Sequence, residues 1–474
     1  MQYSVVKSSK IDLGDRIDAE YFEPSYLENE SKLKRVNAEP LSKYVKLASS
    51  AFYPSATGYY EIGEMPFIRC VDCIDFPAIT ELQKEKFERL PHDFIEENKT
   101  IKKIKDGDIV ITKVGSPCFA SIIYGLGEVA LSRTVLGAYK IKDIDPFYLI
   151  VFLRSKYGFD QLIRERELTI QYQLTLDRVG RILIYKPSNN FQKIIRQLFI
   201  KSQDLYINEI KLYQKAEELL LSELELLNWK PKHKLSFVKN YSDTEQSERF
   251  DAEYFQPFYE EVENELSKFE QKTLDEISSL INYGTVPTSP YVEQGIPYIK
   301  GLNLVDGFIG GSFDYLCNTE KLPKKFYVKE NDIIISQMGT VGKAGLVSKN
   351  EENFLFASFT IRARLTNYDF IDPYVLTLFI NIVARPYYLM RKIAQASVRQ
   401  NTDLPTIKAL KIPKLQSHLQ KKIKDMIFES QKSRKLSKSL LEIAKRGVEM
   451  AIEKDEEEAE KWISSKLEKI KVIL

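Results

Sequence analysis

The sequence predicts a mixed α/β (α+β) fold in which two homologous domains are joined by a long antiparallel two-helix coiled coil with approximate twofold symmetry. Three observations predict this fold: an internal repeat, short β-branched stretches between turn signals in each half, and a long proline-free segment at the end of each half. A chain of 474 residues is also too long for one core and suits two or three domains.

The repeat is clearest in a nine-residue box that occurs once in each half. Arg16-Ile-Asp-Ala-Glu-Tyr-Phe22-Glu-Pro24 returns as Arg249-Phe-Asp-Ala-Glu-Tyr-Phe255-Gln-Pro257, with only two substitutions. Further pairs of segments recur in the same order: Pro66–Arg69 with Pro297–Lys300, Asp108–Gly115 with Asp332–Gly339, and Asp145–Phe147 with Asp372–Tyr374. Such ordered matches indicate a duplicated unit.

Each half begins with a mixed domain and ends with a helix. Strand-like stretches such as Ile109–Ile111 and Ile333–Ile335 lie among turn residues, and helical patches such as Phe147–Leu153 and Tyr374–Ile382 intervene. The predicted boundaries are domain 1 at 1-187, a first spacer helix at 188-231, domain 2 at 232-413, and a second spacer helix with a C-terminal tail at 414-474.

The two predicted helices, Phe191–Trp229 and Leu419–Trp462, carry a coiled-coil pattern. Leucines recur at every seventh residue from Leu198 to Leu226, which is typical of a coiled-coil seam. The second helix has smaller residues at that spacing: Ile423, Ser430, Ser437, Ala444 and Ala451. We expect these residues to admit the leucines, so that the helices pair. The chain path makes the pair antiparallel, and separate surface helices are the alternative.

The composition excludes several classes of protein. No apolar run approaches the ~20 residues that span a bilayer, so no membrane association is expected. The N-terminal sequence lacks signal-peptide features and four cysteines do not suggest a disulfide framework, so we expect a reduced, cytoplasmic protein. The net charge of +2 gives no basic signature, so any DNA-binding prediction must rest on where the charges lie.

Polar loops near the strand ends are candidate contacts for double-stranded DNA. Gln and Asn can bind adenine in bidentate fashion, Arg and Lys can bind guanine, and Ser, Thr and glycine amides can hold phosphates. Two similar domains at a fixed separation suit a duplex whose grooves recur every ~34 Å. In domain 1 the predicted contacts are Arg69, Lys113, Ser116, Arg133, Thr134, Gln171 and Gln173. In domain 2 they are Tyr283, Thr285, Lys300, Asn303, Gln337, Thr340, Lys343, Ser358, Thr360, Arg362, Arg399, Gln400 and Asn401.

Some of these positions differ between the two halves. Lys113 stands opposite Gln337, and Arg69 stands opposite Lys300, so the two domains could read different bases. For any single loop, an ordinary polar turn is the alternative.

The order of these parts resembles the specificity (S) subunit of type I restriction-modification enzymes. The resemblance rests on the two domains, the box before each of them, the Gly107–Ser116 strand and turn, the closing helices, and the segment Leu440–Glu453. The chain departs from the family at Gly115-Ser-Pro-Cys118, where a second glycine is usual, and in its Gln171–Gln173 loop.

The resemblance implies a non-catalytic subunit with two target-recognition domains, each reading one half of a split DNA target. The implied partners are double-stranded DNA, two methyltransferase subunits and, through them, restriction subunits. No cofactor is expected in this chain, and S-adenosylmethionine is expected in the methyltransferase subunits. A protein-interaction scaffold of a related defence system, with little intrinsic DNA specificity, is the alternative.

Residues suited to catalysis or metal binding are sparse. No Asn-Pro-Pro-Tyr/Phe segment of an amino-methyltransferase occurs, and Gly125–Ala130 fits a glycine-rich loop less well than a β-turn. Cys70 and Cys73 have metal-ligand spacing but lack a second pair of ligands. We therefore predict no catalytic, cofactor-binding or metal site. In the repeated box, we expect Arg16 and Arg249 to pair with nearby carboxylates at the joint between a domain and the coiled coil.

Overall fold

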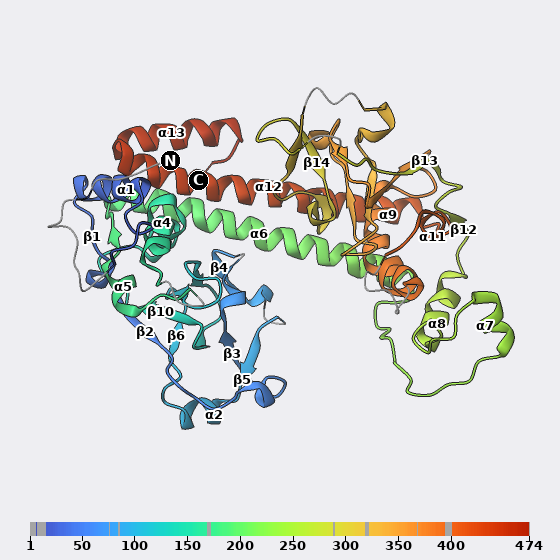
Figure 1. Cartoon of the computed structure of the whole chain (residues 1–474), viewed down its shortest axis with the longest axis horizontal. Helices are drawn as coiled ribbons and strands as arrows, with labels where there is room; N and C mark the ends of the chain where they lie inside the picture. Colours follow the sequence, from blue (N-terminus) through green and yellow to red (C-terminus); the bar gives the residue numbers. More distant parts are fainter. Residues whose placement is uncertain are drawn as a thin grey trace. The chain divides into compact units, whose positions relative to one another are not determined.

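The chain folds into two compact units. The computed structural model describes residues 6, 16–74, 76–83, 86–167, 172–287, 290–317, 322–366, 368–393 and 401–473. Unit 1 comprises Met1–Ile210 and Lys432–Leu474, and unit 2 comprises Lys211–Gln431. Each unit combines helices with β-sheets (Figure 1), which confirms the predicted mixed fold.

Unit 1 contains a five-stranded sheet of order β2-β10-β7-β8-β4, a four-stranded sheet of order β5-β3-β9-β6, and the pair β1-β11. All four residues of β7 are buried, because both faces of this central strand are covered: Ile109 and Ile111 belong to one core cluster and Val110 to another. The strands are β1 (Glu39–Pro40), β2 (Lys46–Ser49), β3 (Met65–Ile68), β4 (Ala78–Ile79), β5 (Glu88–Leu90), β6 (Lys103–Lys105), β7 (Ile109–Thr112), β8 (Ala120–Ile123), β9 (Glu128–Leu131), β10 (Val135–Tyr139) and β11 (Leu183–Ile184).

Unit 2 repeats this plan with a six-stranded sheet of order β13-β21-β18-β19-β16-β15, a three-stranded sheet of order β17-β14-β20, and the pair β12-β22. Its strands are β12 (Gln271–Thr273), β13 (Ser278–Tyr283), β14 (Ile296–Ile299), β15 (Leu304–Val305), β16 (Gly307–Ile309), β17 (Asp314–Leu316), β18 (Ile333–Ser336), β19 (Ala344–Leu346), β20 (Leu355–Phe356), β21 (Thr360–Leu365) and β22 (Lys411–Pro413).

The strand pairings of the two units correspond. Strand β7 lies antiparallel to β10 and β8, just as β18 lies antiparallel to β21 and β19. Strand β3 runs antiparallel to β5 and parallel to β9, just as β14 runs antiparallel to β17 and parallel to β20. The duplication predicted from the sequence is therefore confirmed at the level of sheet topology.

The short helices also begin in equivalent ways. In unit 1, the Asp145 carboxylate accepts hydrogen bonds from the first amides of α3, and in unit 2 the Asp372 carboxylate caps α9. A proline follows each aspartate, at a position where a helix needs no amide donor. Unit 1 contains α1 (Pro24–Arg35), α2 (His92–Glu97), α3 (Pro146–Arg154), α4 (Lys156–Glu165) and α5 (Leu176–Arg181). Unit 2 contains α7 (Tyr241–Ser247), α8 (Pro257–Leu266), α9 (Pro373–Phe379), the π-helix η9 (Ile380–Leu389), α10 (Met390–Lys392) and α11 (Leu404–Lys408).

The two long helices are α6 (Asn189–Glu223) and α12 (Ser417–Glu453), and each contributes to both units. Within unit 1, Ser202 Oγ donates to the Ser437 carbonyl at 3.0 Å and Ser437 Oγ donates to the Ser202 carbonyl at 2.8 Å. Asn208 donates to Ser433 at 3.0 Å. The residue numbers therefore rise on one helix as they fall on the other, and the pairing in unit 1 is antiparallel, as predicted.

The details of the seam differ from the prediction. The predicted small positions of α12 are buried, Ser437 and Ala444 among them, but Ser437 faces Ser202 and not a leucine. On α6 the heptad residues Leu205, Leu212 and Leu219 are only half-buried. Leu198 of the heptad is fully buried, and so are residues beside the heptad: Ile195, Phe199, Ser202, Ala216 and Leu220. In unit 2, Ala216 and Leu220 share a core with Ile423 and Ile427 of α12.

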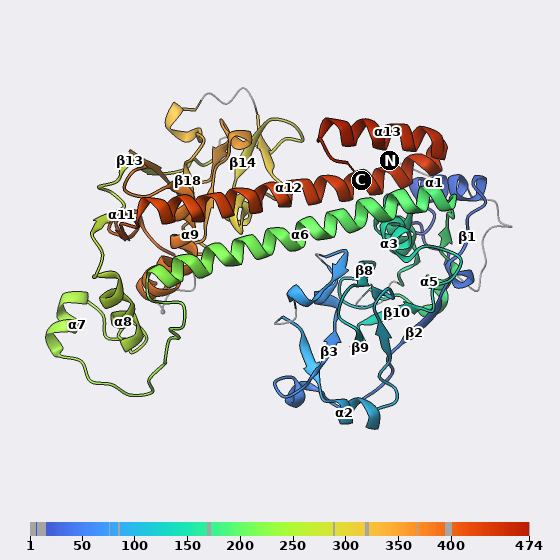
Figure 2. The same ribbon diagram turned by 180° about the vertical axis from the view of Figure 1, so that it is seen from behind.

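The second long helix ends earlier than the predicted Trp462. Asp455 has an extended backbone, and its carboxylate caps a new helix, α13 (Glu456–Lys469). This helix lies beside the C-terminal part of α12 in both views (Figures 1 and 2). A Cβ on Gly447 would lie 2.7 Å from Ile463 Cδ1, so glycine permits this close approach. Glu456 then accepts hydrogen bonds from the Ser188 amide and the Tyr185 hydroxyl, which connects the start of α13 to the residues just before α6.

Candidate nucleic-acid interface

The predicted contact loops of unit 2 converge at one end of its six-stranded sheet. This loop cluster consists of residues 283–287, 300–303, 336–343, 357–360 and 401–402. The amide of Gln337 donates to the Phe359 carbonyl at 3.0 Å, and the Thr402 amide donates to the Gln337 carbonyl at 3.1 Å. The Ser358 amide donates to the Thr285 carbonyl at 2.9 Å. Gly301 lies against Ser336 and Thr340, so the turn at 300–303 belongs to the same cluster.

Unit 1 has an equivalent loop cluster, at residues 49–54, 69–72, 113–118, 132–134 and 173–174. The Lys113 amide donates to the Thr134 carbonyl at 2.8 Å, and the Leu174 amide donates to the Lys113 carbonyl at 3.0 Å. The Cys70 amide donates to Thr134 Oγ1 at 3.1 Å, which joins the turn at 69–72 to the cluster. The backbone hydrogen bonds of Lys113 therefore repeat those of Gln337 in unit 2.

The turn after the central strand keeps its shape despite the departure in the sequence. In unit 2, Gly339 and Gly342 have φ angles of 76° and 73°, and the Gly342 amide donates to the Ser336 carbonyl. In unit 1, Gly115 has φ 91° and the buried Cys118 has φ 83°, with the Cys118 amide donating to the Thr112 carbonyl. A side chain in this backbone region costs on the order of 1 kcal/mol or more. The fold thus holds Cys118 where a glycine is usual.

Most of the predicted contact residues lie at least partly exposed in these clusters. Exposed or partly exposed are Arg69, Lys113, Ser116, Arg133, Thr134, Gln173, Tyr283, Lys300, Gln337, Thr340, Lys343, Ser358 and Asn401. The predicted residues Gln171, Arg399 and Gln400 lie outside the described residues. Tyr283 is partly tied up, because its hydroxyl accepts a hydrogen bond from the Leu404 amide at 2.9 Å.

The structure corrects the prediction for Arg362, which is fully buried. Its guanidinium donates to the Tyr327 carbonyl at 3.0 Å, the Lys325 carbonyl at 2.7 Å and Asn282 Oδ1 at 2.6 Å. Burial lowers the pKa of this guanidinium to about 10, so it remains charged at neutral pH. With these partners and no exposure, Arg362 supports the sheet and presents no donor to a base.

Three other predicted residues are buried and use their polar atoms inside the loop cluster. Asn303 Nδ2 donates to the carbonyls of Gly310 and Ser312, and its Oδ1 accepts from the Lys300 amide. Thr360 Oγ1 donates to the Ala357 carbonyl, and Thr285 is 7% exposed. These side chains shape the turns that carry the exposed residues.

Sequence reasoning missed two aromatic residues beside Arg133. The Arg133 guanidinium lies 5.0 Å from the Tyr53 ring centroid and 5.9 Å from that of Phe52, and Phe52 is 77% exposed. The signal was available, because Phe52 and Tyr53 precede Pro54 just as Thr285 and Val286 precede Pro287. Unit 1 thus adds an exposed aromatic group to its loop cluster, and such groups can stack on bases.

The repeated box makes the same contacts in both units. Arg16 donates to Asp18 at 2.7 Å, and Arg249 donates to Asp251 at 2.6 Å, so the predicted pairing with carboxylates is confirmed. The hydrogen bond from Arg16 lowers the pKa of Asp18 to about 2. In each unit an arginine on a neighbouring helix donates to the tyrosine carbonyl of the box, Arg164 in α4 and Arg391 in α10. The box therefore contacts a neighbouring helix of its own unit in both halves.

Among the described residues, two thiols with metal-ligand spacing have hydrogen-bond partners within the fold. The thiols of Cys70 and Cys73 donate to the carbonyls of Ser116 and Arg69, and burial raises the pKa of both. Among the described residues, no group of three or more His, Cys, Asp or Glu side chains could hold a metal ion. Within that same part of the chain, no helix is both long and apolar enough to cross a membrane.

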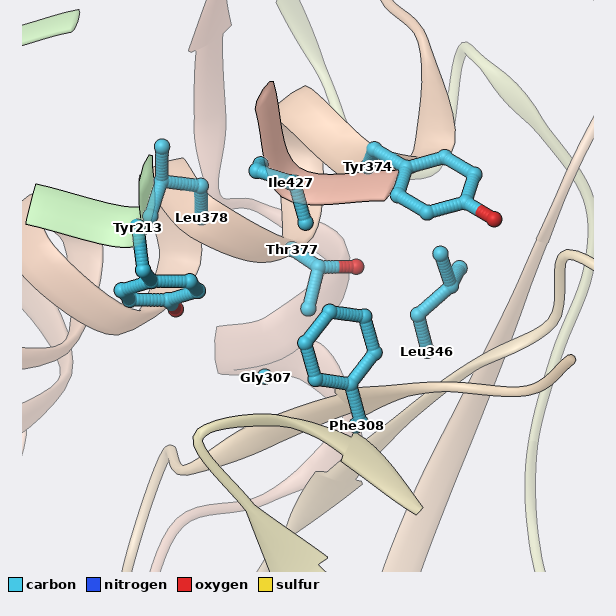
Figure 3. A pocket seen from close by; sticks show the side chains of 8 residues that line it. All are labelled: Tyr213, Gly307, Phe308, Leu346, Tyr374, Thr377, Leu378 and Ile427. Carbon is cyan, nitrogen blue, oxygen red and sulfur yellow. The ribbon is translucent and has the colours of Figure 1, made fainter. Parts of the chain in front are cut away.

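A pocket in unit 2 is apolar and very small. Figure 3 shows the side chains that surround it, and its volume is about 10 Å³, which is room for about one water molecule. Its lining residues are Tyr213, Gly307, Phe308, Leu346, Tyr374, Thr377, Leu378 and Ile427. A nucleotide-sized cofactor does not fit such a space, which is a packing gap between α6, α9 and the sheet.

No known family's sequence profile matches the chain, and no curated protein matches it by sequence. Among solved structures it is similar to the type I restriction-modification S subunit from M. genitalium, with 13% identity over 86% of this chain and 93% of that one and a TM-score of 0.46. It is also similar to the HsdS subunit from Thermoanaerobacter tengcongensis, with 13% identity, 88% and 96% coverage and a TM-score of 0.28. A third similar structure comes from work on the structural basis of complex assembly and conformational transition of the type I R-M system. It has 12% identity over 91% of this chain and 96% of that one, and a TM-score of 0.29. At these identities and TM-scores the similarities carry no argument about function, which has to come from the chain's own residues.

Proposed function

We propose that this chain is the DNA sequence-recognition subunit of a type I restriction-modification complex, in which each unit reads one half of a bipartite duplex target. The observation that supports this proposal most is the equivalence of the two loop clusters. The backbone hydrogen bonds at Lys113 and Gln337 correspond, while the side chains at matching positions differ, Lys113 from Gln337 and Arg69 from Lys300. Two domains that recognise different half-sites need the same backbone arrangement with different polar side chains exposed on it.

The proposed contacts combine positioning with base recognition. Glycine-rich turns and hydroxyls, as at Ser116 and Thr340, suit phosphate oxygens, whereas Gln337 can bind adenine in bidentate fashion. The residues proposed to contact DNA are Arg69, Lys113, Ser116, Arg133, Gln173, Lys300, Gln337, Thr340, Lys343, Ser358 and Asn401, together with Gln171, Arg399 and Gln400.

In this proposal the chain itself is not an enzyme. It positions two methyltransferase subunits, which bind S-adenosylmethionine, and through them the restriction subunits, in the cytoplasm. The long helices α6 and α12 act as the spacer that sets the gap between the two half-sites.

Sequence-resolved mapping of DNA methylation tests the proposal. A host that lacks the gene receives either the gene or an empty vector, with the methyltransferase gene present in both. The proposal predicts a gapped, two-part methylated motif that appears only with the gene. Identical methylation in both strains would contradict it and would favour an interaction scaffold with little DNA specificity.

A further inference from the structure

Arg69 and Lys300 occupy the same position in the two loop clusters. Each residue follows the last residue of a central strand, β3 or β14, and begins a short turn with almost the same backbone angles, φ −119° and ψ 169° at Arg69 and φ −116° and ψ 172° at Lys300. The Arg69 amide donates to Asp72, and the Lys300 amide donates to Asn303. The backbone thus presents both cations in the same way.

Each cation is paired with a carboxylate from the neighbouring antiparallel strand. Arg69 Nη1 lies 3.0 Å from Glu88 Oε1, and Lys300 Nζ forms an ion pair with Asp314. Glu88 is the register partner of Phe67, and Asp314 is the register partner of Tyr298. The two carboxylates therefore come from equivalent positions of β5 and β17, although neither residue type is identical between the units.

The stability of the fold does not account for this recurrence. Surface ion pairs contribute about 0 to 1 kcal/mol, and the carboxylate of each pair remains partly open to solvent, with the Glu88 side chain 35% exposed and that of Asp314 44% exposed, whereas Arg69 is 29% and Lys300 18% exposed. Both pairs nevertheless adjoin the loop clusters. The Cys70 amide, next to Arg69, bonds to Thr134, and Gly301, next to Lys300, lies against Ser336.

The chemistry of such a pair matches a base pair better than it matches a phosphate. A phosphate offers only acceptors and a negative charge, which the carboxylate repels. The major-groove edge of a G·C pair offers guanine N7 and O6 as acceptors and the cytosine amino group as a donor. A cation beside a carboxylate presents the complementary donor and acceptor.

We propose that Glu88 and Asp314 are specificity-determining residues, each forming with Arg69 or Lys300 a unit that reads one G·C pair of the half-site. The cation contacts guanine and the carboxylate accepts from the cytosine amino group. This inference rests on the proposed DNA-recognition function. The flanking groups differ, since Arg69 also lies 3.7 Å from Asp72, whereas Lys300 lies 4.3 Å from the Tyr291 ring centroid.

The test measures binding of the full-length chain, co-purified with its methyltransferase subunits, to duplex DNA. The target is first selected from a pool of randomised duplexes, and affinity is then measured for the target and for every single-base-pair variant. For the wild type, one position in each half-site should require G·C. Glu88→Gln should lower discrimination at that position in one half-site by about fivefold or more, within the range that one bidentate base contact provides. Asp314→Asn should do the same in the other half-site only.

The salt dependence of DNA affinity is a second measurement, and it would not change if Glu88 only stabilised the fold. Once Glu88 loses its charge, Arg69 can neutralise a phosphate, so the slope of log affinity against log salt concentration should steepen by about 0.9. Matched controls remove a carboxylate charge from an exposed ion pair elsewhere in the same unit. These controls are Glu128→Gln, which pairs with Lys103 in unit 1, and Asp275→Asn, which pairs with Lys408 in unit 2.

The outcomes separate the inference from the proposed function. If the wild type selects no sequence, the recognition function itself is wrong. If the wild type selects a target but Glu88→Gln and Asp314→Asn keep its discrimination profile and salt slope, the inference is overturned and the function stands. A uniform loss of affinity on all duplexes, together with a lowered unfolding temperature, would show that these carboxylates only stabilise the fold. That result would also overturn the inference. Because the two variants lie in different units, failure of one to fold leaves the other to decide.

Discussion

Replacing Arg362 with methionine tests whether this arginine supports the sheet of unit 2 or contacts DNA. The Arg362→Met side chain has a similar length and fills the same buried space, but it removes the charge and the donors. Three acceptors lose their partner: the Tyr327 and Lys325 carbonyls and Asn282 Oδ1. Asp332, 3.5 Å from the guanidinium, loses one of its two cations.

The expected loss of stability in Arg362→Met follows from these contacts. Hydrogen bonds to a charged group contribute about 1.5 to 3 kcal/mol each, and breaking a buried ion pair costs about 3 to 5 kcal/mol. Asp332 keeps its bidentate contact with Arg364, at 2.6 and 2.7 Å, so its charge stays compensated. We therefore expect Arg362→Met to lower the free energy of unfolding of unit 2 by about 3 to 5 kcal/mol.

The assay is urea unfolding followed by tryptophan fluorescence. Each unit contains one of the two tryptophans, so a Trp462→Phe background leaves Trp229 to report on unit 2. Trp229 packs edge-on against Tyr387, at 5.2 Å between centroids, and should sense the loss of that core. Lys349→Met, which removes an exposed cation from the same unit, is the matched control.

Two results together would refute this reasoning. One is a change of less than about 1 kcal/mol in the unfolding free energy, comparable to a surface substitution. The other is a selective loss of discrimination at one base pair. That pattern would return Arg362 to the set of DNA contacts.

Three further predictions concern pH, helix pairing and base recognition. Burial raises the pKa of Glu217 to about 7, with the charges of Asp306 and Glu218 adding to the effect, so the folded state favours the protonated carboxyl. Unit 2 should therefore lose stability as pH rises from the ordinary glutamate pKa of 4.5 through about 7. Glu217→Gln should raise the urea midpoint of unit 2 at about pH 8 but not at about pH 4, and equal shifts at both would contradict this. Ser437→Leu should lower the stability of unit 1, followed by Trp462 fluorescence, by about 3 kcal/mol or more, because a larger side chain would press on the Ser202 backbone and the Ser437 hydroxyl would lose its hydrogen bonds to the Ser202 carbonyl and the Ser202 hydroxyl. An unchanged midpoint would argue against this close crossing. Gln337→Ala should cost about 1 to 3 kcal/mol of discrimination at one base pair, and full discrimination at every position would remove Gln337 from the proposed contacts.

The sequence could predict those features that repeat or that depend on local chemistry. The duplicated strands around Ile109–Thr112 and Ile333–Ser336 followed from β-branched runs between turns, and the helical patches predicted at Phe147–Leu153 and Tyr374–Ile382 lie within α3 and within α9 and the start of η9. The convergence of the loops of unit 2 was also predictable in outline, because the antiparallel strands β13, β21 and β18 bring three of them to the same sheet end.

Features that depend on tertiary packing escaped prediction. Arg362 lies in a strand that is covered on both faces, so alternation along Thr360–Leu365 could not tell which arginine is buried. The break before α13 depends on Asp455, which caps the new helix, and on Ile463, which packs at Gly447. From the sequence alone, Gly447 indicates only a weak point within a long helix. On α6, Leu205, Leu212 and Leu219 are only half-buried, whereas Leu198 and the neighbouring Phe199 and Leu220 are buried, because tertiary contacts decide which part of the apolar face is covered.

The central claim is that the two units read two half-sites independently. The most direct test exchanges residues 1-187 for those of a related specificity subunit and maps the methylated motif in the host genome. The account predicts that one half of the motif changes while the other half and the length of the gap stay the same. A change in both halves, or in neither, would contradict independent reading by two units.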